Sequence, residues 1–106
     1  MSDWREVTAA ERELMRSCGP GEVAIFYGDE LVKITSERML QIYRDAVNAA
    51  IKGAAEMLAL ERADEIESWT VDDFEMGQTF VRVTLTSKAG AQASAIGMIA
   101  DPRRTH

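Results

Sequence analysis

Apolar residues recur every three or four positions from Ser36 to about Ile66, which predicts one long helix with two apolar sides. One side is large and branched, and we expect it to lie on a sheet: Leu40, Tyr43, Val47, Ile51, Ala54 and Leu58. The second stripe has small residues in its middle: Met39, Ile42, Ala46, Ala49, Gly53, Met57 and Leu60. Thr35 or Ser36 caps the start. The acidic residues that follow Leu60 oppose the helix dipole, so the helix is predicted to end near Leu60 or Arg62.

The second stripe has two interpretations, because small residues let either of two helices come close. A short N-terminal helix of the same chain covers it, or a helix of a second copy does. A helix of about 27 residues is roughly 40 Å long, whereas an N-terminal helix of about ten residues covers some 15 Å of it. Soluble monomers rarely leave the remainder exposed. We predict a homodimer with these residues at or near the interface: Met39, Ala46, Ala49, Gly53, Met57 and Leu60.

Shorter periodic segments surround the long helix. Thr8 and Glu11 have the spacing of a capping box, which predicts a helix from there to about Ser17, and Gly19-Pro20 stops it. Alternating or β-branched runs predict five strands, in two hairpin-connected groups: 23–27 and 31–35, then 68–76, 79–86 and 91–100. Gly28-Asp29 forms the first turn.

These elements predict an α+β fold of the order α-ββ-α-βββ. We expect one five-stranded antiparallel sheet with the long helix packed across one face. The 106 residues fit a single domain, 1–106. Residues 1–7 are expected to be a loose segment, held only by Trp4, and 101–106 a short tail.

The side-chain chemistry argues against an enzyme. Cys18 is the single cysteine, and the single histidine, His106, is the last residue. This argues against Cys–His and Ser–His–Asp catalysis and against histidine-ligated metals, so no catalytic residue, metal or cofactor is predicted. No run of 18 apolar residues and no apolar signal core is present, which indicates a cytoplasmic protein without a membrane partner.

Acidic charge is concentrated in one window. The net charge is −6, and residues 54–80 hold eight acids and one base, a net −7 that leaves +1 for the rest. This is the wrong sign for binding nucleic acid through phosphates. A solvated face, a partner surface and a hard-cation site stay open, although Asp72 and Asp73 point to opposite faces of a strand. The residues of the possible partner surface are Asp64, Glu67, Asp72, Asp73 and Glu75.

The chain resembles the roadblock/LC7 family in the order of its elements. The resemblance is carried by the Gly19-Pro20 break, the strands 23–27 and 31–35 around the Gly28 turn, the long helix, and the paired strands 79–86 and 91–100. It implies a non-catalytic homodimer that scaffolds or regulates small GTPases or motor complexes, paired through the long helix and the adjoining sheet edge. The alternative is a small acidic inhibitor or accessory protein, phage-like in kind, that binds a basic surface of its target.

Overall fold

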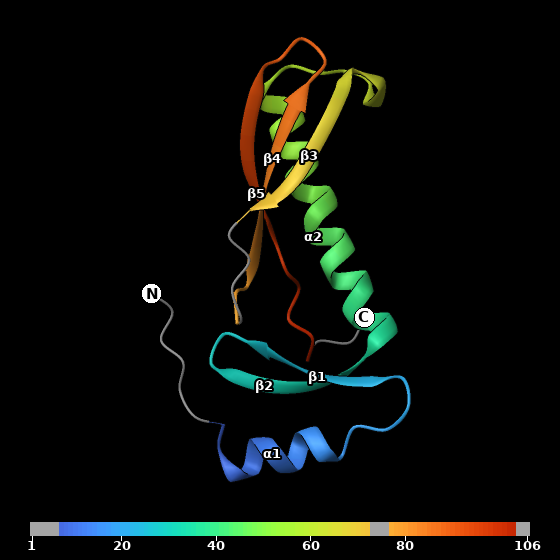
Figure 1. The fold of residues 1–106 in the computed structure, drawn as a ribbon, viewed down its shortest axis with the longest axis vertical. Coiled ribbons are helices and arrows are strands. Elements are labelled where there is room, and N and C mark those ends of the chain that lie inside the picture. Colours follow the sequence, from blue (N-terminus) through green and yellow to red (C-terminus); the bar gives the residue numbers. More distant parts are fainter. Residues whose placement is uncertain (1–6, 73–76, 104–106) are drawn as a thin grey trace.

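A computed structural model of the chain describes residues 7–72 and 77–103. The predicted order of elements and the α+β class are confirmed (Figure 1). The elements are α1 Ala9–Arg16, β1 Glu22–Tyr27, β2 Glu30–Thr35, α2 Ser36–Met57, a short 3₁₀ turn η1 Ala63–Glu65, β3 Ile66–Asp72, β4 Phe80–Ser87 and β5 Gln92–Met98. The expected role of Trp4 and the expected strand positions 73–76 lie outside the described residues.

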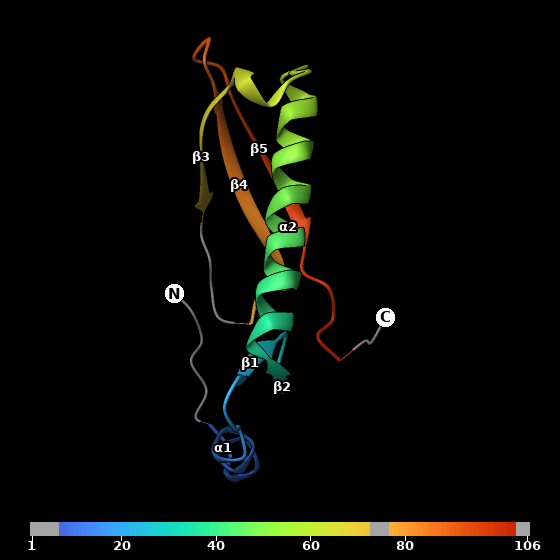
Figure 2. The ribbon, with the colours of Figure 1, turned by 90° about the vertical axis from the view of Figure 1, so that its right-hand side faces the viewer.

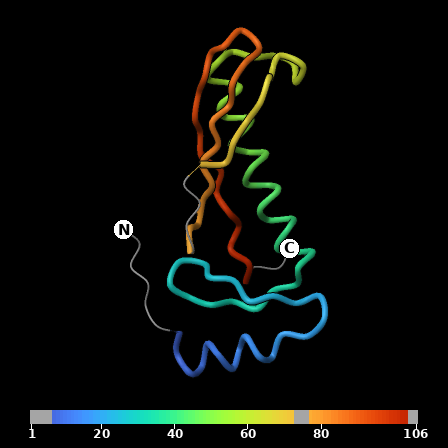
Figure 3. Tube along the Cα trace, viewed as in Figure 1, coloured from blue at the N-terminus to red at the C-terminus, as the bar shows by residue number. Residues whose placement is uncertain are grey.

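The prediction of a single five-stranded sheet is wrong, because the strands form two antiparallel sheets. One contains β1 and β2, and the other has the order β3-β4-β5. Since β2 ends at Thr35 and α2 begins at Ser36, the hairpin is fixed to the start of α2 and lies across the lower end of the meander (Figures 1 and 3). The two sheets meet there: the Tyr27 hydroxyl donates to the Ile99 carbonyl at 3.0 Å, and the Gly28 N–H donates to the Gly77 carbonyl at 2.8 Å.

Helix α1 begins at the predicted capping box. The Thr8 hydroxyl oxygen accepts from the Glu11 N–H at 3.1 Å, and the Glu11 carboxylate accepts from the Thr8 N–H at 2.9 Å. The helix packs against β1 and β2. The interpretation in which this helix covers the second stripe of α2 is therefore wrong.

Helix α2 starts where it was predicted and ends earlier. Thr35 is the cap, and its hydroxyl oxygen accepts from the Arg38 N–H at 3.1 Å. The last helical residue is Met57, one turn before the predicted end at Leu60 or Arg62. Ala59 has a φ of 55°, a left-handed conformation that turns the chain out of the helix.

The side of α2 that lies on the sheet is its narrow, alanine-rich side. Its buried residues Ile42, Ala46, Ala50 and Ala54 pack over β4 and β5, whose inward residues include the buried Val81, Val83 and Leu85. The assignment of the large, branched stripe to the sheet is wrong for most of its length: Leu40 is exposed, and Val47 and Ile51 are half-buried at the edge of the core. Small side chains bring the helix close to the strands, and the branched residues are left along its flank.

The resulting molecule is long and flat. Its extents are 51 × 33 × 19 Å, with the meander on one side of α2 and the hairpin and α1 at its lower end (Figure 2). The radius of gyration is 16.5 Å, against about 13 Å for a compact chain of this length. This shape leaves surfaces that a rounder fold would bury.

Candidate interaction surfaces

The six residues predicted at a homodimer interface are divided between core and surface. Ala46 has no exposed surface and lies beneath β5, and a Cβ on Gly53 would meet the Ala95 Cβ at 3.2 Å. The packing reason for these small residues is thus the chain's own strand. Ala49 and Met57 are exposed, and Met39 and Leu60 are intermediate. The homodimer itself stays a prediction.

A second surface is the part of the inner sheet face that α2 does not cover. Trp69 is paired with Leu85, and Val71 with Val83, so both point to the helix side of the sheet. Because α2 lies over β4 and β5, these β3 side chains remain 47% and 42% exposed. The sequence alternation predicted their shared face correctly, but not that the helix would leave them uncovered.

On the opposite face of the sheet, β5 presents large apolar residues to solvent. Ile96 and Met98 are 54% and 63% exposed, whereas the inward positions of the same strand are Ala93, Ala95 and Gly97. Sequence reasoning missed this surface. The sequence of β5 does alternate between small and large residues, but the small residues occupy the inward positions and the large ones face solvent.

The described acids of the window lie mainly on the surface, at the end of α2 and the start of β3. Asp64 and Glu67 are exposed, and Asp64 forms an ion pair with Arg62 at 3.3 Å. Asp72 differs, because it is half-buried and its carboxylate accepts from the Thr84 hydroxyl and, at 3.2 Å, from the Thr70 hydroxyl. Asp73 and Glu75 lie outside the described residues. The described part of the predicted partner surface is therefore divided between exposed acids and one hydrogen-bonded carboxylate.

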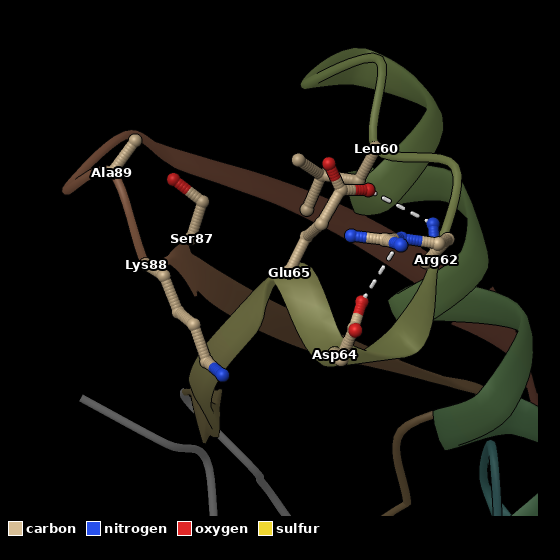
Figure 4. Close-up of a pocket in the computed structure, with 7 residues that line it drawn as sticks. All are labelled: Leu60, Arg62, Asp64, Glu65, Ser87, Lys88 and Ala89. Atoms are coloured by element: carbon tan, nitrogen blue, oxygen red, sulfur yellow. Dashed lines mark hydrogen bonds and ion pairs between the residues drawn. The ribbon is translucent and has the colours of Figure 1, made fainter.

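A pocket of about 410 Å³ opens beside η1, between the end of α2 and the β4–β5 turn (Figure 4). Within it, the Glu65 carboxylate accepts from the backbone N–H groups of Arg62 and Glu61 at 2.9 and 2.8 Å, which lowers the pKa of Glu65 from its ordinary value. Arg62 is paired with Asp64 (Figure 4). Lys88 also lines the pocket (Figure 4). The Arg62–Asp64 pair and the hydrogen bonds of Glu65 hold the turn that follows α2 together.

The described residues contain neither a cluster of possible metal ligands nor a helix that could span a membrane. Across 7–72 and 77–103, no group of three or more His, Cys, Asp or Glu side chains is gathered as metal ligands would be. No helix in these ranges is long and apolar enough to cross a membrane.

Comparison with known proteins identifies no relative. No family model matches the chain, and neither a curated protein nor a solved structure matches it.

Proposed function

We propose that this chain acts by protein–protein binding, as a non-catalytic homodimeric scaffold or regulatory protein of the roadblock-like type. The observation that supports this most is the apolar surface left uncovered in a single copy. Trp69 and Val71 on the helix side of β3, and Ile96 and Met98 on the other face, are all more than two-fifths exposed. Soluble monomers rarely keep several such patches unless they bind something.

The accessible surface supports the same proposal. The whole chain, which includes the residues outside 7–72 and 77–103, exposes 7346 Å², whereas a compact monomer of 11.8 kDa exposes roughly 5,900 Å². The excess of about 1,400 Å² is larger than the roughly 800 Å² that each partner contributes to an interface of standard size. The excess is thus enough for one interface of standard size, which we assign to a second copy. The family resemblance suggests a small GTPase as a further partner, which would bind at another part of the surface.

Sedimentation equilibrium of the native chain at about tens of micromolar tests the homodimer. We expect the mass of a dimer. The mass of a monomer throughout this range would overturn the proposal, because the exposed apolar surface would then be stable without a second copy.

The second candidate function is an acidic inhibitor that occupies a basic surface. It is favoured by the exposure of Glu56, Glu61, Asp64 and Glu67, which follow one another from the last turn of α2 to the start of β3. Binding of this kind weakens strongly as salt is added, because exposed charges are screened. An association that tolerates salt would favour the first candidate instead.

A further inference from the structure

We infer that a second copy of this chain pairs with the free edge of β5, strand to strand and antiparallel. The two three-stranded sheets would then join into one sheet of six strands. This rests on the proposed homodimer and assigns it a surface.

The hydrogen bonds at both ends of the β4–β5 ladder determine which backbone groups of β5 are free. The Ile99 N–H donates to the Thr79 carbonyl at 2.8 Å, and the Ser87 N–H donates to the Ala91 carbonyl at 2.8 Å. Hydrogen-bonded and non-hydrogen-bonded pairs alternate along an antiparallel ladder, so the odd-numbered residues of β5 direct their backbone groups at β4. The N–H and C=O groups that point out of the sheet are those of Gln92, Ser94, Ile96 and Met98. Among the described residues, β5 has no strand on that side.

The two edges of the meander are protected differently. Natural edge strands usually carry charges, proline or a bulge that discourage pairing. β3 has such features: it contains Glu67 and Asp72, and its register shifts between Ile66 and Ser68. β5 contains no charged residue and no proline, and its register with β4 is unbroken from Gln92 to Met98. The β5 edge is therefore the one that is open to another strand.

A second copy of β5 fits this edge better than an unrelated strand. A two-fold axis relates antiparallel strands, and the register centred on Ala95 pairs Gln92 with Met98 of the second copy and Ser94 with Ile96 of the second copy. In this register all four outward N–H groups and all four outward carbonyls of each strand find partners. Because the strand is uncharged, pairing with itself brings no like charges together.

The surrounding side chains leave room for this pairing. On the outer face, it would cover part of the exposed Ile96 and Met98 side chains. On the inner face, the positions next to the axis are the small residues Ala93, Ala95 and Gly97. Figure 1 shows α2 behind the meander and not beyond the β5 edge, so the helix does not block a second strand.

A pair of proline variants tests which edge is used. Ser94→Pro removes an outward N–H and places a ring in the free edge of β5. It keeps every backbone hydrogen bond of the β4–β5 ladder and removes one side-chain bond, between the Ser94 and Thr84 hydroxyls at 2.8 Å. Val71→Pro is the matched control, because the even-numbered residues of β4 bond to β3 and the N–H of Val71 therefore points out of the opposite edge. We expect sedimentation to give a monomer for Ser94→Pro and a dimer for Val71→Pro, both with native circular dichroism.

Ile96→Lys provides a second variant that spares the backbone, since Ile96 is exposed and lysine is a common protector of edges. It should also give a folded monomer. In the native dimer, amide hydrogen exchange should be slow at Ser94 and Ile96 and fast at Trp69 and Val71. A monomeric native chain would overturn both the proposed function and this inference. A native dimer that persists in Ser94→Pro and Ile96→Lys, with rapid exchange at Ser94 and Ile96, would overturn this inference alone.

Discussion

Gly97 determines how closely α2 can approach β5. A Cβ at this position would lie 1.8 Å from the Ala46 carbonyl oxygen and 3.0 Å from the Ala50 backbone nitrogen. Both neighbours are backbone atoms of a helix, so they cannot turn aside as the end of a flexible side chain would. The close contact between helix and strand thus depends on the absence of one methyl group.

Gly97→Ala should therefore destabilise the fold by about 1–3 kcal/mol, the usual cost of overpacking a well-packed core. Urea unfolding followed by circular dichroism measures it. Gly53→Ala is the matched control, because its Cβ would meet only the Ala95 side chain, at 3.2 Å, and alanine improves the helix by about 1 kcal/mol. A loss in Gly97→Ala no larger than that in Gly53→Ala would contradict this account of the contact.

Glu65 gives the turn after α2 a dependence on pH. Its carboxylate accepts from the Arg62 and Glu61 N–H groups, and these bonds lower its pKa in the folded chain from the ordinary value. A carboxyl whose pKa is lowered by folding stabilises the folded state above its unfolded pKa, and this contribution disappears as pH falls through the folded value. We expect carboxyl NMR titration to give Glu65 a lower pKa in the folded chain than in the unfolded chain, and stability to fall less between about pH 5 and pH 3 in Glu65→Gln than in the native chain. Equal slopes in the two proteins would exclude this role.

Among the elements, α2 has a start that one side-chain cap defines. The sequence left Thr35 and Ser36 as alternative caps, and the structure selects Thr35, whose hydroxyl oxygen accepts from the Arg38 N–H. The Ser36 hydroxyl instead donates to the Gly21 carbonyl at 3.3 Å. Thr35 therefore links the end of the hairpin to the first turn of the long helix.

Thr35→Ala should lower the free energy of unfolding by about 1 kcal/mol, the usual effect of losing a helix cap. Ser36→Ala is the matched control and should cost less, since its single hydrogen bond is longer and exposed. Thermal unfolding of both variants decides between the two residues. A larger loss in Ser36→Ala would indicate that Ser36 is the cap.

The elements could be predicted because their signals are local. The Thr8–Glu11 capping box, the turn at Gly28 and the alternation of Val81, Val83 and Leu85 each lie within a few residues. The side of α2 that packs on the sheet was not predictable from hydrophobicity, which favours Val47 and Ile51 over alanine. It depends on how closely a helix can approach strands that contain Ala95 and Gly97, and these residues are far away in the chain.

At the scale of the whole molecule, the sequence pattern does not predict how the two groups of strands are arranged relative to each other. Hairpin signals identify which neighbouring strands pair, but no local signal states whether β1 lies beside β5 or crosses the end of the meander. The structure joins the two sheets at their ends, through Tyr27 and Gly28. The same arrangement leaves the edge of β5 and the inner face of β3 open, so the candidate surfaces could not be predicted without it.

The net charge of −6 lets one salt titration distinguish the two candidate functions. Two copies of an acidic chain repel each other, and the Debye length shortens from about 30 Å at 0.01 M salt to about 8 Å at 0.15 M. A homodimer held by strand pairing and apolar contacts should therefore become tighter as salt rises over this range. An acidic inhibitor on a basic target should bind more weakly instead, because the attraction between opposite charges is screened.

Sedimentation equilibrium at both salt concentrations shows whether added salt tightens or weakens the homodimer. Glu61→Lys, an exposed position, reduces the net charge from −6 to about −4 and should make the response to salt smaller. A native dimer that dissociates as salt is added would show that ion pairs hold it together. That result would contradict a dimer formed through β5, whose paired residues carry no charge.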